Sequence, residues 1–314
     1  MRAVWLRETG GPEVLVPGEA PDPVAGPGQA LIDVELANIT FVETQLRAGT
    51  APFSLDLPVI PGNGVGGVVA AVGGGVGEEL LGRRVVSSLG GSGGYAELAV
   101  VDVGGIVEVP DGVGLDAAVA LLADGRTATS LVRAAAPQAG ERVLVEAAAG
   151  GVGSLLVQLS VSASAVVIAA AGGERKLELA RSLGAEHAVD YTDRRWPERV
   201  GVVDIVFDGV GGETAAEAFK LLAPGGRMVS FGLASGHWAP VSEDDAAERG
   251  IELVHPGRPS LEEQRELTES ALEEAAAGRL RPVIGQRFPL ERAAEAHAAI
   301  ESRSTVGKTL LEVS

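Results

Sequence analysis

The sequence contains no cysteine. This absence excludes disulfide bonds and the thiolate ligands on which structural zinc sites are built. Histidine is scarce as well: His187, His237, His255 and His297 are scattered, and no two have the i, i+4 spacing that brings two imidazoles to one helix face. We therefore expect no metal site.

Long apolar runs and excess positive charge are also lacking. No apolar run reaches the length of roughly 18 residues that a membrane span needs. The first residues show no basic patch that leads into an apolar stretch, as a secretory signal would. We expect a cytoplasmic protein with no membrane partner. A formal net charge of −18 repels phosphate backbones, so no nucleic-acid partner is expected either.

What is present predicts two domains. A length of 314 residues, 46% of them hydrophobic, suits two separate cores. Up to about residue 110, short β runs are separated by Gly and Pro, and they are expected at residues 2–6, 29–36, 67–72, 84–88 and 95–101. This pattern predicts a β-rich domain, which a helix at residues 115–136 follows.

From residue 142 onward, strand-like and helical runs alternate. Strands are expected at residues 142–148, 165–171, 188–191, 202–208, 227–233 and 251–255, with helices at 154–160, 174–183 and 213–222. Such alternation is typical of an α/β fold, a doubly wound parallel sheet covered by helices. The tail predicts helices at residues 261–277 and 289–302 and a last strand at 308–313.

A glycine-rich turn follows the expected strand 143–148. It contains Gly150, Gly151, Val152 and Gly153 and leads into an apolar helix. Exposed amides and the helix dipole favour a pyrophosphate at such a place. In the pattern G-x-G-x-x-G the first slot is occupied by Ala148. The alternative interpretation is a tight strand-to-helix turn with no ligand.

The next strand ends without a carboxylate. Its last residues and the turn, 170–173, read Ala-Ala-Gly-Gly, whereas NAD-binding folds usually place Asp or Glu there on the ribose 2′-hydroxyl. Arg175 and Lys176 follow, and their charges suit a 2′-phosphate. These features favour NADPH over NADH. The alternative is that both residues are solvated cations in the first turn of the helix.

Several motifs occur in order along nearly the whole chain. They are LRETGGPEV (6–14), LPVIPG (57–62), GYAE (94–97), GRTA (125–128), EAAAGGVG (146–153), LGAEHAVDY (183–191), VDIVFDGVGG (203–212) and LAPGGRMVSFG (222–232). Together they resemble the zeta-crystallin-like quinone oxidoreductases, zinc-free members of the medium-chain dehydrogenase/reductase superfamily. The resemblance implies a Rossmann domain at residues 115–256 and a β-rich, GroES-like catalytic domain at 1–114 and 257–314.

The resemblance also implies a cofactor site. Thr127 is expected near the nicotinamide, Gly150 to Gly153 on the pyrophosphate, and Lys176 with Tyr191 at the adenosine phosphate. Phe231 and Gly232 are expected at the nicotinamide ribose. Arg303 matches an arginine of the family that reaches the cofactor, and the alternative for it is an exposed cation at a helix end.

The segment 38–49 resembles the active-site loop of the family, aligned through Arg47 and Gly49. In this register Thr40 replaces an asparagine, Glu43 replaces an aspartate, and Gln45 and Ala51 replace two tyrosines. A two-residue shift gives the asparagine role to Asn38 instead. Elsewhere, Gly64 stands where the family usually has Glu, Arg83 where it has Asp, and Glu146 where His is common. The resemblance implies a substrate pocket lined by Asn38, Thr40, Phe41 and Gln45.

Three functions follow as hypotheses. The first is metal-free hydride transfer from NADPH to a quinone or another conjugated carbonyl, with Thr40, Gln45 or a backbone amide as hydrogen-bond donor to the product oxygen. The second is an enoyl or tailoring reductase that acts on a bulky polyketide-like or acyl enone. The third is a non-catalytic NADPH-binding protein. We expect a small-molecule substrate and a homodimer.

Overall fold

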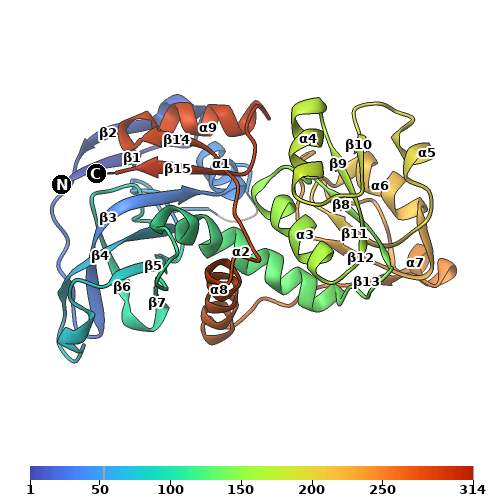
Figure 1. The fold of residues 1–314 in the computed structure, drawn as a ribbon. Helices are drawn as coiled ribbons and strands as arrows, with labels where there is room; N and C mark the ends of the chain where they lie inside the picture. The colour runs from blue at the N-terminus through green and yellow to red at the C-terminus, as the bar shows by residue number, and fades with distance from the viewer. Residues whose placement is uncertain (52–53, 314) are drawn as a thin grey trace. The chain divides into compact units, whose positions relative to one another are not determined.

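The computed structural model describes residues 1–51 and 54–313. The chain forms two compact units: Met1–Arg126 with Ser260–Ser314, and Thr127–Pro259. The long helix α2, Leu115–Ala135, belongs to both units, because the division falls between Arg126 and Thr127. Figure 1 shows the elements of each unit, coloured from blue at the N-terminus to red at the C-terminus.

The first unit is built on an antiparallel sheet with one parallel pair. The strands run in the order β14-β15-β3-β4-β5-β7, and β6 also pairs with β3. Their bounds are β3 Gln29–Ile39, β4 Gly64–Val72, β5 Arg84–Ser88, β6 Leu98–Asp102, β7 Ile106–Glu108, β14 Ile284–Pro289 and β15 Lys308–Glu312. A separate hairpin pairs β1, Arg2–Leu6, with β2, Leu15–Glu19. The β-rich domain expected from the sequence is confirmed.

The core of this unit comes from alternation along the strands. Ala30, Ile32 and Val34 of β3 face inward and are fully buried, whereas Asp33 and Glu35, which alternate with Val34, are exposed. Such period-2 burial removes apolar area from water on one sheet face. Leu311 and Ala296, from β15 and α9 (Ala293–Glu301), join the same cluster, so the C-terminal segment completes the core of the N-terminal one.

Two sequence expectations for this unit are wrong. The active-site segment, expected as a loop, contains the helix α1, Phe41–Ala48, which begins at the N-cap Thr40 and ends at Gly49 in the left-handed region, φ 75°. The helix expected from residue 289 begins only at Ala293, because residues 284–289 form β14. This strand pairs with β15, a partner that a local pattern does not reveal. Helix α8 spans Leu261–Ala276.

The second unit is an open parallel sheet with helices on both faces (Figure 1). The strand order is β10-β9-β8-β11-β12-β13, and all pairs are parallel. The strands are β8 Arg142–Glu146, β9 Val166–Ala171, β10 His187–Asp190, β11 Val203–Asp208, β12 Leu222–Ser230 and β13 Glu252–Leu253. The helices are α3 Gly151–Ser162, α4 Glu174–Ser182, α5 Trp196–Val200, α6 Gly212–Lys220 and α7 Glu243–Arg249. The expected Rossmann fold is confirmed.

The direction in which successive strands are added to this sheet reverses after β10, between the neighbouring strands β8 and β11. From β8 the chain moves outward through β9 to β10, and it then returns to add β11 on the other side of β8. Helix α3 accordingly packs on β8 and β9, whereas α6 packs on β11 and β12. Ligands of such sheets bind outside the carboxyl ends of the strands at this switch point.

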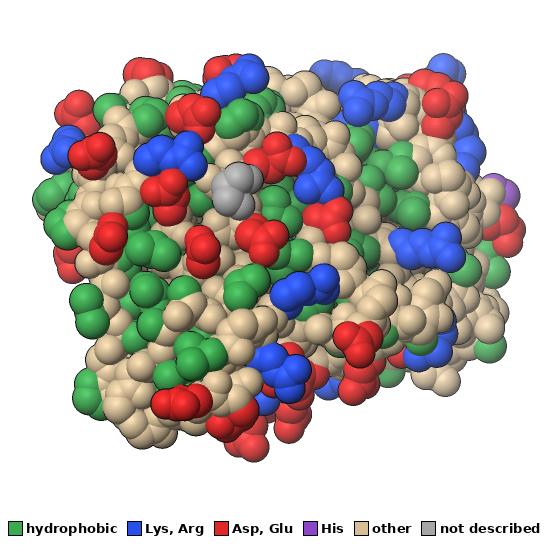
Figure 2. Space-filling view, turned by 60° about the vertical axis from the view of Figure 1, so that its left-hand side comes forward, with side chains coloured by type: hydrophobic (Ala, Val, Ile, Leu, Met, Phe, Trp, Pro, Cys, Tyr) green, Lys and Arg blue, Asp and Glu red, His purple; other side chains and the backbone are tan. Residues whose placement is uncertain are grey.

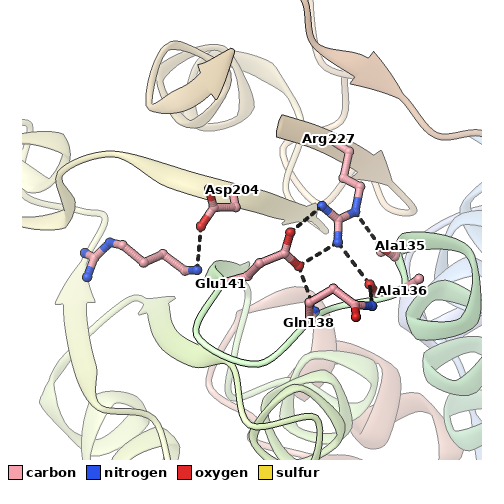
Figure 3. A network of polar contacts seen from close by, with 7 residues as sticks. Ala135, Ala136, Gln138, Glu141, Asp204 and Arg227 are labelled. Atoms are coloured by element: carbon pink, nitrogen blue, oxygen red, sulfur yellow. Dashed lines mark hydrogen bonds and ion pairs between the residues drawn. The ribbon is translucent and has the colours of Figure 1, made fainter. Parts of the chain in front are cut away.

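A polar network fixes the opposite, amino end of the sheet (Figure 3). The Arg227 guanidinium on β12 donates to both carboxylate oxygens of Glu141, at 2.9 and 2.7 Å, and to the carbonyl oxygens of Ala135 and Ala136. One residue later, the Arg142 backbone N–H donates to Asp204 at 2.8 Å. Arg227 therefore caps the last carbonyls of α2 and sets where β8 begins.

The charged surface is mixed. Figure 2 shows acidic and basic side chains interspersed over one face of the molecule. This distribution is typical of a solvated surface. Within residues 1–51 and 54–313, no helix is long and apolar enough to cross a membrane.

Candidate cofactor and substrate sites

The phosphate turn of the second unit begins where β8 ends. After Glu146, Ala147 has φ 47°, a left-handed conformation that alanine seldom adopts, and Gly150 is the N-cap of α3. A Cβ on Gly153 would lie 2.2 Å from the Ala147 carbonyl oxygen. Only glycine therefore allows α3 to start so close to the strand. The first turn of a helix has N–H groups without intrahelical partners, and here they lie at the carboxyl edge of the sheet.

The turn after β9 contains the residues expected at the adenosine phosphate. Gly173, with φ 85°, precedes α4; Arg175 is exposed and Lys176 is half-buried in the first turn of that helix. A Cβ on Gly172 would lie 3.4 Å from Cε2 of Tyr191, so the tyrosine ring packs against the turn. The structure thus brings Tyr191 to the β9–α4 turn.

A carboxylate that sequence reasoning missed also reaches this turn. Asp190, the last residue of β10, accepts hydrogen bonds from the Gly173 N–H at 3.1 Å and from the Thr192 N–H and hydroxyl at 2.9 and 2.7 Å. Burial acts to raise the pKa of Asp190, but the bonds from Thr192 and Gly173 outweigh it and lower the pKa. The signal in the sequence was its place at the end of the neighbouring strand, opposite Ala171.

The turns after β11 and β12 lie against each other. The Phe231 N–H donates to the Asp208 carbonyl oxygen at 2.9 Å. A Cβ on Gly209 would lie 2.7 Å from the Phe231 ring, and one on Gly232 would lie 2.7 Å from the Gly209 carbonyl oxygen. Two glycines therefore permit this close packing, which places Phe231 and Gly232 at the carboxyl edge of the sheet. Thr127 is half-buried on α2.

In the first unit, α1 presents the expected substrate residues. Thr40 precedes the helix, and Phe41 and Gln45, at i and i+4, share one half-buried face. Asn38, two residues before Thr40, lies on β3 and is only 1% exposed. Its Nδ2 donates to the Val119 carbonyl oxygen at 3.4 Å. Three of the four predicted pocket residues therefore remain accessible and the fourth is buried.

Glu43 is tied to Thr40. Its Oε2 accepts hydrogen bonds from the Thr40 N–H at 2.5 Å and from the Thr40 hydroxyl at 2.7 Å, and its Oε1 accepts from the Asn63 N–H at 3.0 Å. The arrangement is a capping box. Burial raises the pKa of Glu43, against the opposing effect of these bonds and of Lys308. The Thr40 proton is thus engaged by Glu43 when that carboxyl is ionised.

Arg47 and Gly49, which align the segment, have structural roles. The Arg47 side chain is 2% exposed and its guanidinium binds the Glu301 carboxylate and the Gly10 carbonyl oxygen. This ion pair draws residues 301–303, at the end of α9, to α1. Arg303 then lies with its guanidinium 4.6 Å from the centre of the Phe41 ring. Two residues predicted from separate motifs therefore meet.

Buried polar pairs that the sequence did not reveal support the same sheet. Lys308 Nζ donates to Asp124 Oδ1 at 2.9 Å, and both side chains are almost fully buried. The Tyr95 hydroxyl and His297 Nε2 lie 2.9 Å apart, and burial lowers the pKa of His297 to about 3, so the imidazole is neutral. His297 is therefore a core residue. In the part of the chain that the structure describes, no cluster of His, Asp and Glu suits a metal ion.

A pocket of about 250 Å³ opens beside the end of α1. It is lined by Thr9, Leu46, Gly49, Ala51, Ser54, Leu55 and Leu57. The wall includes Ala51. The resemblance to the family implies that this alanine stands in place of a tyrosine. The small side chain there leaves space that an aromatic ring would fill.

Two family models match the chain. One is described as an alcohol dehydrogenase GroES-like domain and matches residues 26–111, and the other is described as a zinc-binding dehydrogenase and matches residues 183–311. The quinone oxidoreductase of Pseudomonas aeruginosa is 32% identical and covers 96% of each chain. The probable quinone oxidoreductase of Schizosaccharomyces pombe is 36% identical over 98% of this chain and 96% of its own. The chain belongs to the quinone oxidoreductase family. The family prediction is therefore confirmed.

Two further matches bear on chemistry. The 2-haloacrylate reductase of a Burkholderia species is 30% identical over 98% of each chain. The quinone oxidoreductase of Escherichia coli, solved in complex with NADPH, superposes with a TM-score of 0.90 at 28% identity and full coverage of both chains.

Proposed function

We propose that this protein is an NADPH-dependent reductase that delivers a hydride to a quinone or to another conjugated carbonyl, without a metal. The observation that carries the proposal is the glycine-lined turn at the start of α3, on the switch point of a parallel sheet. Membership of a family with a relative solved in complex with NADPH supports it.

The residues present fit NADPH. Gly150, Gly151, Val152 and Gly153 offer helix N-terminal amides to the pyrophosphate, and Gly153 leaves no side chain in the way. Arg175 and Lys176 lie in the first turn after β9, where cations suit the 2′-phosphate, and the Tyr191 ring packs beside them. Thr127, Phe231, Gly232 and Arg303 are proposed contacts of the remainder of the cofactor. NADPH, when bound, supplies the hydride.

Residues of α1 and its N-cap are proposed to contact the hydride acceptor. Phe41 and Gln45 form one accessible face, and the Thr40 hydroxyl lies beside them. Reduction of a conjugated carbonyl places negative charge on its oxygen, which needs a hydrogen-bond donor. Thr40 and Gln45 both carry one. We propose Thr40 as the main donor, because its hydroxyl lies 2.7 Å from Glu43 Oε2, and burial raises the pKa of this carboxyl.

Enone reduction is the second candidate. A relative named 2-haloacrylate reductase acts on a conjugated acid, and the pocket wall at Ala51 is open where a tyrosine would stack on a flat ring. This opening favours a bulky acyl enone over a small quinone.

The homodimer and the cytoplasmic location stay predictions. Sedimentation equilibrium of the purified protein tests whether it forms a homodimer.

Stopped-flow oxidation of NADPH, followed by absorbance against a panel of quinones and enones, tests the function. We expect saturable turnover with at least one conjugated carbonyl. Tight NADPH binding with no oxidation by any member of the panel would leave only the cofactor-binding role and overturn the proposed reaction.

A further inference from the structure

Two carboxyl side chains face each other inside the second unit. Glu146 is the last residue of β8 and Asp208 is the last residue of β11, and both are 0% exposed. The two strands are neighbours, with Phe207 paired to Val145, so Glu146 and Asp208 occupy the next positions in register. The pair therefore lies at the switch point of the sheet, directly below the phosphate turn.

The hydrogen bonds around the pair are incomplete. Asp208 Oδ1 accepts from the Val210 N–H at 3.0 Å and from the Gly211 N–H at 2.7 Å. Asp208 Oδ2 and both oxygens of Glu146 have no donor in the part of the chain described by the structure. Two ionised carboxylates are strongly unfavourable in such a place, because neither is solvated and they repel each other. One proton between them removes the repulsion and gives Asp208 Oδ2 a hydrogen-bond donor.

The electrostatics agree with a proton on Glu146. Burial raises its pKa well above the usual range, and the charge of Asp208 and a hydrogen bond to it add to this effect. A hydrogen bond from the Val210 N–H, which faces the pair, acts to lower the pKa of Glu146. Glu146 is thus the neutral donor and Asp208 the acceptor, whose other oxygen holds the turn after β11.

The bond joins two turns of the proposed cofactor site. Glu146 leads at once into Ala147 and the phosphate turn, and Asp208 leads into Gly209, on which Phe231 packs. We propose that one proton shared by Glu146 and Asp208 holds these two turns in their binding geometry, so that cofactor affinity falls when the proton is lost. Glu146 is accordingly a positioning residue, and the inference rests on the proposed binding of NADPH.

Few other charges face the pair. The neighbouring strand β9 offers only Ala169 to Ala171, and α3 carries no charged residue. Near the Asp208 turn, α6 carries Glu213 in its first turn, and the backbone of His237 packs against Gly211. The side chains of Glu213 and His237 are both exposed. His237 is therefore the titratable group whose effect must be separated from that of the pair.

The test measures the Kd of NADPH from pH 6 to pH 10 by fluorescence titration. In the native protein the Kd should rise toward tenfold per pH unit once the shared proton is lost. Glu146→Gln should bind as the native protein does at pH 6 and stay level above it, since its amide donates to Asp208 and does not titrate. Glu146→Ala should bind at least tenfold more weakly at every pH. The 2′-phosphate titrates at about pH 6 whichever variant binds it, so its effect on the Kd cancels in the comparison.

Two controls complete the design. His237→Gln should leave the native profile unchanged. Calorimetry at pH 9 in two buffers of different ionisation enthalpy should show that binding takes up a proton in the native protein and none in Glu146→Gln. Equal pH profiles for native protein and Glu146→Gln, or tight binding by Glu146→Ala, would overturn the inference. Absence of NADPH binding by the native protein at every pH would instead refute the proposed function.

Discussion

The Arg303 guanidinium lies 4.6 Å from the centre of the Phe41 ring, although the two residues are 262 positions apart in the sequence. The Arg47–Glu301 ion pair brings the two segments together. Arg303 has φ 59°, in the left-handed region that a non-glycine residue adopts at a cost of about 1 to 2 kcal/mol. A conformation held against that cost marks Arg303 as a functional candidate.

We expect Arg303→Ala to weaken NADPH binding about fivefold to tenfold, because a charge-assisted contact is worth about 1 to 3 kcal/mol and the residue is exposed. The matched control is Arg292→Ala, which removes an exposed arginine that likewise lies over a ring, Phe288. Fluorescence titration compares both variants with the native protein. Equal losses in the two variants would mean that Arg303 has no specific role.

The native protein should bind NADPH at least tenfold more tightly than NADH. Arg175→Ala and Lys176→Ala should each reduce this preference, since each removes a cation suited to the 2′-phosphate. Asp190 is close to the turn but accepts hydrogen bonds from Gly173 and Thr192, so its charge is already engaged. Titrations with both cofactors decide the matter. Equal affinities of the native protein for NADPH and NADH would contradict the predicted preference. Arg194→Ala serves as the control, because Arg194 is an exposed arginine that follows β10.

Thr40→Val should lower kcat at least tenfold and leave the Kd of NADPH unchanged, whereas Thr40→Ser should keep most of the activity. Valine also removes an N-cap, which costs about 1 kcal/mol of stability. Thermal melting therefore accompanies the kinetics, to show that the variant is folded under the assay conditions. A Thr40→Val enzyme with native kcat would exclude the hydroxyl as the donor.

The same contact predicts a pH dependence. The pKa of Glu43 is raised by burial, so a protonated Glu43 can donate to the Thr40 oxygen and leave the Thr40 proton for the substrate. The rate should be full below the pKa of Glu43 and fall as pH rises through it. Glu43→Gln should remove this fall, since glutamine completes the capping box without titrating. A persistent fall in that variant would assign it to another group.

Ala51→Tyr should raise activity with a small benzoquinone and lower it with a bulky acyl enone. The ring fills part of the pocket beside α1 and adds a stacking contact worth about 1 kcal/mol. Steady-state kinetics with both substrates provide the comparison. If the native enzyme prefers the small quinone and the added ring changes neither rate, Ala51 does not face the substrate.

Turnover should survive exhaustive chelation, because hydride transfer to a conjugated carbonyl is proposed here with hydrogen-bond donors alone. Activity before and after treatment with a chelator, together with metal analysis of the purified protein, measures this. Stoichiometric zinc whose removal abolishes turnover would overturn the metal-free mechanism.

Local patterns in the sequence were sufficient for the parallel sheet and the phosphate turn. Val143, Leu144 and Val145 form a continuous apolar strand because both faces of a parallel sheet are covered, and the spacing of Gly150 and Gly153 reports a helix that starts against a strand. The family motifs fixed the relation to quinone oxidoreductases in the same way. α1 escaped notice because a helix of eight residues gives little periodicity, and the capping pair Thr40 and Glu43 is its clearest signal.

Only the tertiary structure decided which side chains meet. Glu146 and Asp208 are 62 positions apart in the chain, from 146 to 208, and become neighbours because β11 returns to the edge of β8. Asp190 reaches the β9–α4 turn through strand pairing, and Arg303 reaches Phe41 through the Arg47–Glu301 ion pair, which joins residues 254 positions apart. Sequence by itself determined most of the parallel sheet and its helices, since apolar periodicity is local, but it did not determine α1 or β14. The shared proton and the ring contact depend on distances that packing alone sets.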